Sequence, residues 1–582
     1  MKKWCLNSLL RSPGISKGGS GRDILLLFLL IILLGSCTKA SPTSLPTISP
    51  ALTLTPNFHT PEETATLTGL PSALPTSSPT QTLHAIWIAP YLPDSLRAAI
   101  TLDNGFVLAS SPEGAEVRLD GGAQGESPDS QWIYALVAPF PTITDGVTSD
   151  YLHNLWFGNT SNPFNGQSLL LDESTLGVLS KFWGSPSPQA VQVLPSEDLL
   201  DYAWDNRPSW AIIPFEALEP RWKVLTIDDQ SPIRKDFDAS TYPLAIPIVL
   251  SGANDTQTEA LTLPNSNRDP SHLTTLAMTG VTALVRGTAL TMEQSGITYP
   301  ALDIGSLLAS ADITHISNEI PFAPNCPFPE LYPSLLVFCS NPRYIELLQA
   351  VGTDIVELTG DHFSDYGPEA TLYTLQMYQD LGWHYYGGGA NAEEARKPLL
   401  IENNGNRLAF LGCNVGCTVK NEIPCDAIAT DTQPGAAQCD FNWISTEIPS
   451  LREEGYQVIF TFQHREYYTY TTEPILAEDF GRVALAGATI VSGSQAHQPH
   501  GFAFENGAYI HYGLGNLFFD QYHFCADYAC DDAFIDRHVF YDGRYISTEL
   551  ITIRFIDLAR PRLMTPDERA HFLEIIFRAS GW

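Results

Sequence analysis

The stretch that decides the fold covers residues 487–520 and reads GATIVSGSQAHQPHGFAFENGAYIHYGLGNLFFD. Its short apolar run at 488–491 predicts a buried strand that leads into a polar loop with two histidines, His497 and His500. The Asn506-Gly507 pair between apolar residues is the strongest short-range signal for a β-hairpin. Because α/β folds place their chemistry just beyond the carboxyl ends of strands, this stretch predicts a rigid unit that carries part of a site.

Length and charge limit the class of protein. The chain has 582 residues, of which 44% are hydrophobic and 11% aromatic, so it is long enough for two or three globular domains. It carries 65 acidic and 31 basic residues, which give a formal net charge of −34. Such a charge repels phosphate backbones, and we therefore expect no nucleic acid partner.

The N-terminus has the pattern of an export signal. Five basic residues precede an apolar run at 24–34, which is too short to span a bilayer comfortably. The residues Leu34-Gly35-Ser36-Cys37 resemble the lipobox of bacterial lipoproteins. The resemblance implies a signal peptide over 1–37, lipidation of Cys37, and an extracytoplasmic lipoprotein anchored to the membrane at a bacterial cell surface. The alternative, an uncleaved anchor, also places the rest of the chain outside the cytoplasm.

Two different segments follow this signal. Residues 38–83 are dominated by Ser, Thr and Pro and cannot bury enough apolar area to fold, so we expect a disordered linker. From 84 to 265, short apolar runs alternate with helix-like segments, which is an α/β pattern. Residues 209–250, with 155–158 upstream, resemble the second lobe of type 2 periplasmic-binding-protein domains. The resemblance implies a cleft for a small solute, and a packing domain without a ligand is the alternative.

The cysteines predict disulfide bonds. Eight remain once Cys5 and Cys37 are set aside, and an even number in an exported chain favours disulfides. The spacing of Cys413 and Cys417 does not fit a zinc knuckle, so we expect no structural zinc site. We expect pairs that are near in sequence: Cys326 with Cys339, Cys525 with Cys530, and pairs among Cys413, Cys417, Cys425 and Cys439.

Polar groups recur at strand ends within residues 270–582. Three apolar strands each lead into a loop that carries a histidine, namely His362, His464 and His497, and a fourth strand ends at Glu319. A lone histidine in such a place is usually structural, but three in one domain, together with Asp361, favour a shared site. Imidazole and carboxylate groups bind Zn, Mn and Fe ions. We therefore predict a site for one or two divalent metals at this edge.

Five ordered motifs resemble the CapA-type poly-γ-glutamate capsule synthesis proteins, which have a calcineurin-like metallophosphoesterase fold. The motifs lie at 311–319, 360–367, 464–467, 487–497 and 512–520. The resemblance implies an α/β sandwich over 270–582 and a role in the synthesis or processing of capsule, poly-γ-glutamate or another exopolymer. The partners that it implies are an anionic polymer or small-molecule ligand and a membrane complex of capsule synthesis.

The chain departs from the family pattern at several ligand positions. Val281 stands where the family has a metal-binding aspartate, and Gln495 stands where it has the first histidine of a pair. Asp361 occupies the position of an amide ligand, and Arg465 places a cation where the family is neutral. His500 compensates for Gln495 only if its loop folds back.

Two hypotheses follow from these matches and departures. In the first, residues 270–582 form a metal-dependent, phosphoesterase-like hydrolase, in which Asp361 replaces the lost carboxylate and Arg465 clamps an anionic substrate. In the second, they form a catalytically degenerate metallophosphoesterase fold that binds polymer or solute outside the cytoplasm, because the lost ligands leave too few for a catalytic ion. The first hypothesis assigns catalysis to Asp361, His464 and Arg465, and metal binding to Glu319, Asp361, His362, His464 and His497.

Overall fold

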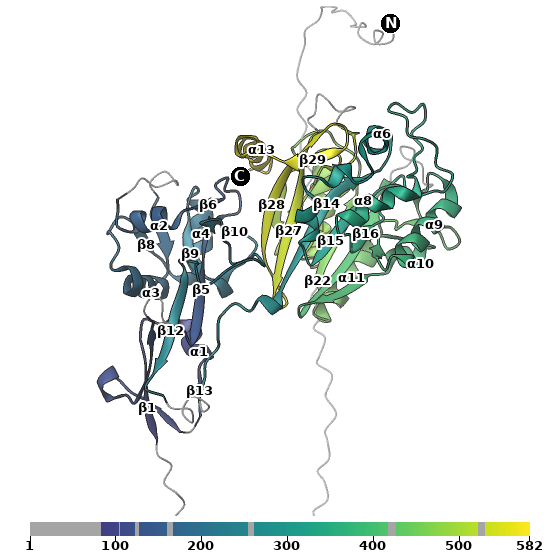
Figure 1. Ribbon diagram of the computed structural model, residues 1–582. Helices are drawn as coiled ribbons and strands as arrows, with labels where there is room; N and C mark the ends of the chain where they lie inside the picture. The colour runs from purple at the N-terminus through teal and green to yellow at the C-terminus, as the bar shows by residue number, and fades with distance from the viewer. Residues whose placement is uncertain are drawn as a thin grey trace, which may run out of the picture. The chain divides into compact units, whose positions relative to one another are not determined.

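The computed structural model describes the chain from Leu83 onward with short gaps (Figure 1). The described residues are 83–103, 105–122, 127–159, 167–253, 261–416, 427–521 and 530–582, and they belong to one compact unit. None of their helices has the length and apolar character needed to cross a membrane. The predicted signal peptide, Cys37 and the linker up to residue 82 lie outside the described residues.

The first part of the described chain builds a nine-stranded mixed sheet. Its strands are β1 (His84–Ile88), β3 (Phe106–Leu108), β4 (Val117–Gly121), β5 (Ser130–Pro139), β7 (Leu169–Leu171), β8 (Val191–Val193), β9 (Ala211–Pro214), β10 (Trp222–Val224) and β12 (Ala245–Ser251). They follow the order β3-β1-β4-β12-β5-β9-β7-β8, and β10 pairs with β5. The long apolar run of the sequence forms β5, which is almost wholly buried and is paired on both edges.

Shorter elements complete this part of the chain. Two ribbons pair β2 (Thr101–Leu102) with β13 (Leu261–Thr262) and β6 (Gly146–Val147) with β11 (Thr226–Ile227). The helices are α1 (Asp94–Ala99), α2 (Ser149–Trp156), α3 (Glu173–Trp183) and α4 (Leu199–Asp205). Apolar residues on each of them join the core of the nine-stranded sheet. The predicted α/β character of this part is thus confirmed, while its likeness to a periplasmic binding protein stays a prediction.

A second sheet has eight strands and begins at residue 273. Its strands are β14 (Leu273–Thr282), β15 (Ile313–Asn318), β16 (Ile355–Glu357), β17 (His384–Tyr386), β26 (Asn516–Phe518), β27 (Asp532–Tyr541), β28 (Arg544–Ile556) and β29 (Arg560–Leu563). The first four run parallel to one another, whereas β27, β28 and β29 extend the sheet with antiparallel pairing. The predicted strands that end at Asn318 and near Glu357 are therefore confirmed.

A third sheet has six strands in the order β19-β20-β22-β23-β25-β24. These are β19 (Leu399–Asn403), β20 (Asn406–Asn414), β22 (Gln457–Gln463), β23 (Ile490–Ser492), β24 (Phe502–Glu505) and β25 (Ala508–His511). The pairs β20–β22, β22–β23 and β23–β25 are parallel. A minor ribbon pairs β18 (Gly388–Gly389) with β21 (Gly435–Ala436).

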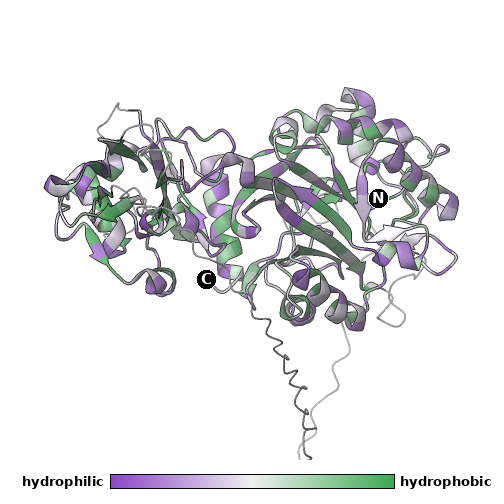
Figure 2. Cartoon of the chain, turned by 90° about the horizontal axis from the view of Figure 1, so that it is seen from below, coloured by the Kyte–Doolittle hydropathy of each residue, from purple (hydrophilic) through white to green (hydrophobic). Residues whose placement is uncertain are grey.

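Alternation along the strands places the second and third sheets face to face. In β14, Leu276 and Met278 share a core cluster with Ile459 of β22, whereas Ala277 between them packs with helices. In β22, Phe460 likewise packs with helices on the other face. The helices are α6 (Arg286–Ser295), α7 (Gly305–Ala309), α8 (Ile345–Ala350), α9 (Gly367–Asp380), α10 (Ala392–Arg396), α11 (Phe441–Glu453), α12 (Pro474–Leu485) and α13 (Pro566–Ala579). Figure 2 shows hydrophobic residues concentrated along the strands that these helices cover.

Local backbone geometry explains the tight hairpins of the third sheet. Asn506 and Gly507 have φ angles of 51° and 80° and connect β24 to β25, which confirms the predicted hairpin. Asn404 and Gly405, with φ angles of 49° and 76°, connect β19 to β20 in the same way. Positive φ at both central positions matches the right-handed twist of the strands, and Asn and Gly tolerate it best.

Two of the predicted disulfides are present in full among the described residues. Cys326 bonds to Cys339 and Cys413 bonds to Cys439, with Cα–Cα distances of 5.7 and 4.9 Å. Cys530 is also disulfide-bonded. Cys417, Cys425 and Cys525 lie outside the described residues, so their pairing stays a prediction.

The core of the nine-stranded sheet continues into the second sheet. Val539 of β27 and Ile546 of β28 belong to the same apolar cluster as Trp210 and Leu244 of the first part. The sequence predicts separate segments at 84–265 and 270–582, and this division stays a prediction. The mixed α/β class is confirmed, and the metallophosphoesterase assignment of the sandwich remains an expectation.

Candidate metal centre

The carboxyl ends of parallel strands carry the polar residues singled out by the sequence. Glu319 directly follows β15, and Asp361 and His362 follow β16, its parallel neighbour. Parallel strands bring such ends to one edge of a sheet, so these residues meet although they are distant in sequence. One ligand atom from each of the three lies within 4.8 Å of the others.

A glycine permits this close approach. A Cβ atom at residue 360 would lie only 2.7 Å from the Cα and the carbonyl oxygen of Glu319, so a side chain there would push the two loops apart. Gly360 therefore lets Asp361 reach Glu319, which is itself 1% exposed. The Gly-Asp-His sequence thus places a second carboxylate beside a buried one.

His362 is oriented by a carboxylate that the sequence did not single out as a site residue. Its Nδ1 lies 2.7 Å from Asp365 Oδ2, which also accepts a hydrogen bond of 2.8 Å from the Phe338 N–H. The ring of Phe338 packs against the imidazole with a centroid distance of 4.9 Å. A carboxylate on one ring nitrogen fixes the imidazole and leaves the other nitrogen for a metal. Asp365 lies three residues after His362 in the predicted motif, and this spacing is the feature that could have identified it from the sequence.

His497 lies next to this group and is held in a similar way. Its Nδ1 is 2.9 Å from Asn516 Oδ1, and its Nε2 is 3.9 Å from Glu319 Oε1 and 3.2 Å from Glu466 Oε1. Burial lowers the pKa of His497, but Glu466 outweighs this and raises it to about 9. Burial raises the pKa of Glu466, and His497 in turn brings it down to about 2. Glu466 is thus a site residue that sequence reasoning missed.

The remaining charges of the group show why a cation fits. Burial raises the pKa of Glu319 to about 8, and nearby Asp361 adds to this although His497 opposes it. Burial also lowers the pKa of His362, but the carboxylates of Asp365 and Glu319 outweigh it and raise the value to about 10. Two adjacent carboxylates in a buried place repel each other, and a divalent cation relieves that repulsion.

Unpartnered polar atoms at the same strand ends also fit a metal or polar ligand. Asp361 Oδ1 is buried and has no hydrogen-bond partner among the described residues. The same holds for side-chain atoms of Asn318 and Gln463, and for both amide atoms of Gln495. Buried polar groups ordinarily have partners, so an unpartnered oxygen on Asp361 favours a ligand at this residue. The donor set of two carboxylates and one imidazole suits Zn, Mn or Fe.

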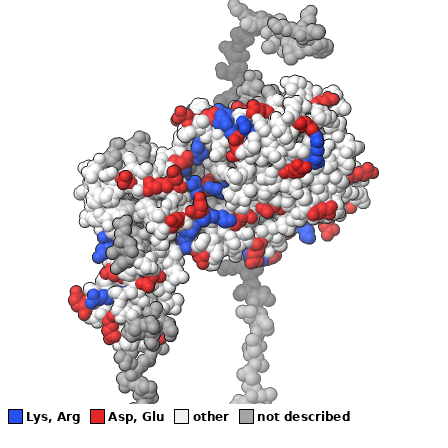
Figure 3. Space-filling view, viewed as in Figure 1, with Lys and Arg blue, Asp and Glu red and all other residues white. Residues whose placement is uncertain are grey.

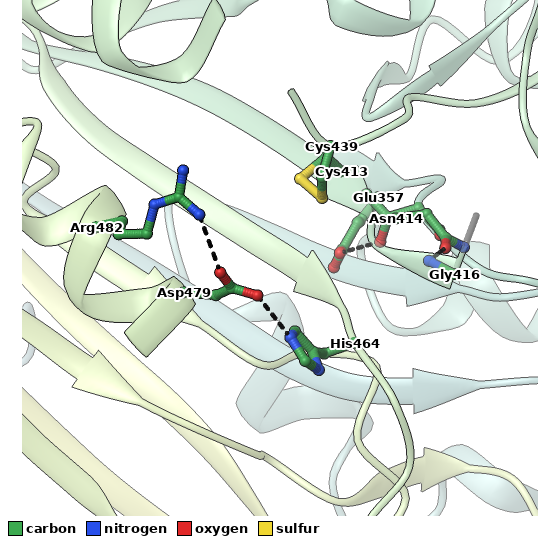
Figure 4. The surroundings of a disulfide bond; sticks show 9 residues. Glu357, Cys413, Asn414, Gly416, Cys439, His464, Asp479 and Arg482 are labelled. Carbon is green, nitrogen blue, oxygen red and sulfur yellow. Dashed lines mark hydrogen bonds and ion pairs between the residues drawn. A yellow bond between two sulfur atoms is a disulfide. The ribbon is translucent and has the colours of Figure 1, made fainter. Parts of the chain in front are cut away.

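The structure places His464 outside this group. Its Nε2 lies 3.1 Å from Asp479 of α12, which also contacts Arg482 (Figure 4). Its Nδ1 accepts a hydrogen bond of 2.9 Å from the Arg465 N–H. Both ring nitrogens therefore have protein partners. His464 is the first residue after β22, which ends at Gln463, and Asp479 of α12 lies within hydrogen-bond distance of its imidazole.

Two of the positions that depart from the family pattern, Val281 and Gln495, are buried. Val281 packs in an apolar cluster with Ile320 and Phe338, so it offers no ligand. His500 packs against Gly513, where a Cβ atom would lie 2.4 Å from its ring, and burial lowers its pKa to about 4. His500 is not part of the group formed by Glu319 and its neighbours within the described part of the chain.

Comparison with known proteins finds a similarity over the part of the chain that carries this site. Residues 275–521 match the family model described as bacterial capsule synthesis protein PGA_cap. This part of the chain is similar to that family. A relative, the capsule biosynthesis protein CapA of Bacillus anthracis, is 25% identical over 181 residues, which are 30% of this chain and 43% of that protein. The chain thus aligns with less than half the length of this curated relative, and the predicted resemblance to CapA-type proteins is confirmed.

Solved structures give weaker matches. An ABC-type phosphate transport receptor from Vibrio cholerae is 14% identical, with a TM-score of 0.24, and the match covers 30% of this chain and 90% of the receptor. A hypothetical protein from Thermus thermophilus is 12% identical, with a TM-score of 0.29, and the match covers 48% of this chain and 98% of that protein. Scores this low carry no conclusion about fold or function.

Proposed function

We propose that this chain is a metal-dependent hydrolase that acts in the synthesis or processing of an anionic capsule polymer outside the cytoplasm. The observation that carries the proposal is the group of Glu319, Asp361 and His362, whose ligand atoms lie within 4.8 Å of one another. The family match over 275–521 supports the polymer context. Phosphoesters and γ-glutamyl bonds are the substrate classes to test.

The residues of the group have distinct roles in this proposal. Glu319, Asp361 and His362 would hold a divalent ion, which supplies Lewis-acid activation of a bound water or substrate oxygen. Asp365 fixes His362 through its Nδ1, and Asn516 fixes His497 in the same way. Glu466 next to His497 provides an acid–base pair at the edge of the group. Arg465, the neighbour of Glu466, is proposed to bind an anionic substrate.

Metal analysis of the purified full chain tests this proposal. After incubation with Mn²⁺ or Zn²⁺ and desalting, the wild-type protein is expected to retain at least one equivalent of metal. Asp361→Asn and His362→Gln are expected to lose it, whereas His464→Gln is a matched control that retains it because its imidazole binds Asp479. Absence of metal from the wild-type protein, or equal retention by all variants, would contradict the proposal.

A second candidate function is that of a polymer- or solute-binding module without catalysis. Val281 in its apolar cluster favours this candidate, because the position offers no carboxylate and leaves fewer ligands for a catalytic ion. The two candidates differ in turnover of phosphodiester and γ-glutamyl substrates by metal-loaded protein. Turnover that Asp361→Asn abolishes supports the hydrolase, and tight polymer binding with no turnover supports the module.

Membrane anchoring through Cys37 is part of the same proposal. The lipobox resemblance motivates it, and such a lipid would hold the chain near a membrane complex of capsule synthesis. Metabolic labelling with a palmitate analogue is expected to mark the wild-type chain and not Cys37→Ala. Equal labelling of both would overturn the assignment of the lipidated residue.

A further inference from the structure

A second cluster of charged side chains lines a cavity of about 360 Å³ beside β10 and β28. Four basic and three acidic residues contribute to its wall, although the whole chain has a net charge of −34. Figure 3 shows basic and acidic side chains interleaved over the region that Figure 1 labels β10 and β28. The basic residues are Lys223, Arg234, Arg537 and Arg569, and the acidic residues are Asp145, Asp229 and Glu549.

One half of this cluster is satisfied by the protein itself. Asp145 binds Arg569 through both carboxylate oxygens, at 2.8 and 2.9 Å, and Lys223 at 2.7 Å. Lys223 also donates to the carbonyl oxygens of Thr142 and Ile143, at 2.7 and 3.3 Å. This half joins β10 to α13 and has a structural role.

In the other half, Asp229 and Glu549 line the wall beside Arg234 and Arg537, and Asp229 contacts Arg234 through its backbone carbonyl oxygen. Arg234 Nε lies 2.8 Å from Glu549 Oε1, and Arg537 Nε lies 2.7 Å from Glu549 Oε2, so two guanidinium groups share one carboxylate. Arg234 Nη2 and Arg537 Nη1 have no hydrogen-bond partner among the described residues. A guanidinium group presents a planar fork of donors that matches carboxylate geometry, so these atoms suit a second carboxylate.

The rest of the wall suits the carbon skeleton of a small ligand. Leu550, Leu563, Met564 and Phe577 contribute apolar surface. Cavities of this size with an apolar wall and a few convergent polar groups are typical of small-molecule sites. The two arginines already bind the side chain of Glu549, which is a carboxylate on a short aliphatic stem.

We propose that this cavity binds a small organic carboxylate, whose anionic group lies on Arg234 and Arg537 and whose aliphatic part lies on the apolar wall. The cavity shares no residue with the metal centre, and the inference does not depend on the proposed hydrolase activity. Glu549 acts as an internal competitor, because its carboxylate occupies part of the same two guanidinium groups.

Isothermal titration of the full chain with glutarate tests the proposal. The wild-type chain is expected to bind one equivalent, and Arg537→Gln and Arg234→Gln are each expected to weaken binding roughly tenfold or more, since each loses a charged hydrogen-bond donor. Glu549→Gln is expected to tighten binding, because it removes the competitor and its negative charge. Arg97→Gln, at an exposed position of helix α1, is the matched control with unchanged affinity.

Each outcome supports or overturns the inference. Tighter binding by Glu549→Gln with weaker binding by both arginine variants supports it, because a purely structural ion-pair network predicts no response to glutarate in any variant. No binding by the wild-type chain and by Glu549→Gln would overturn it. Binding of inorganic phosphate without binding of glutarate would overturn the assignment to carboxylates.

Discussion

Two groups of histidine and carboxylate residues differ in how their charges are balanced. Between the facing sheets, Asp536 Oδ2 accepts a hydrogen bond of 2.9 Å from the Tyr509 hydroxyl and lies 2.7 Å from His511 Nδ1. At the strand ends, Glu319 and Asp361 instead place two carboxylates side by side. Burial raises the pKa of Asp536, but His511 outweighs it and the net shift is downward, whereas the pKa of Glu319 stays raised. The first carboxylate is stabilised in its charged form by the protein, whereas burial and Asp361 disfavour the charged form of the second.

Breaking the buried pair of Asp536 and His511 should have the largest effect on stability. Asp536→Ala leaves His511 and Tyr509 without the acceptor that joins the two sheets, and we expect the free energy of unfolding to fall by about 3–5 kcal/mol. Urea denaturation measures this. Asp380→Ala, at the exposed end of α9, is the control and should change the value by less than about 0.5 kcal/mol. A loss of less than about 1 kcal/mol in the free energy of unfolding of Asp536→Ala would contradict a stabilising role for this carboxylate.

Removing a carboxylate from the strand-end group should act in the opposite direction on the metal-free protein. Asp361→Asn relieves the repulsion with Glu319, so its free energy of unfolding in EDTA should equal or exceed that of the wild type. With Mn²⁺ at 100 times its Kd, the wild type should gain about 2.7 kcal/mol and the variant none. The measurement is urea denaturation with and without Mn²⁺. Equal gains by both proteins would show that the ion binds elsewhere.

A carboxylate that orients a ligand should matter less than the ligand. Asp365→Ala frees Nδ1 of His362 and should lower Mn²⁺ affinity about 10–100-fold in calorimetric titration. Asp479→Ala removes the equivalent partner of His464, which lies outside the group, and should leave the affinity unchanged. If Asp479→Ala lowers the Mn²⁺ affinity as much as Asp365→Ala does, His464 belongs to the site.

The smallest expected effect concerns pH and the charged cavity. Burial lowers the pKa of Lys223 to about 8, although Asp145 opposes this. The unfolded chain keeps that proton up to about pH 10.4. Because the unfolded state then binds more protons, stability from this group rises with pH above 8, by about 1 kcal/mol near pH 9. Urea denaturation between pH 7.5 and 9 should show no such rise in the free energy of unfolding for Lys223→Gln. An equal rise in the variant and the wild type would contradict this prediction.

Local signals in the sequence were sufficient to predict much of this fold. The Asn506-Gly507 hairpin and the strands before Glu319 and His362 follow from backbone propensity and apolar patterning, which act over a few residues. Glu319, Asp361 and His362 could be named because parallel strand ends share one edge. The pairing of His464 with Asp479 could not be predicted, since it depends on how α12 packs in the fold. Glu466 was missed because only the fold brings it to His497.

The central claim is that Glu319, Asp361 and His362 form one divalent-metal site. Anomalous diffraction from crystals of the chain grown with Mn²⁺ tests it most directly. We expect an anomalous peak at coordination distance, about 2.0–2.2 Å, from side-chain atoms of all three residues. A peak bound to His464 instead, or no peak beside Glu319 and Asp361 at saturating Mn²⁺, would contradict it.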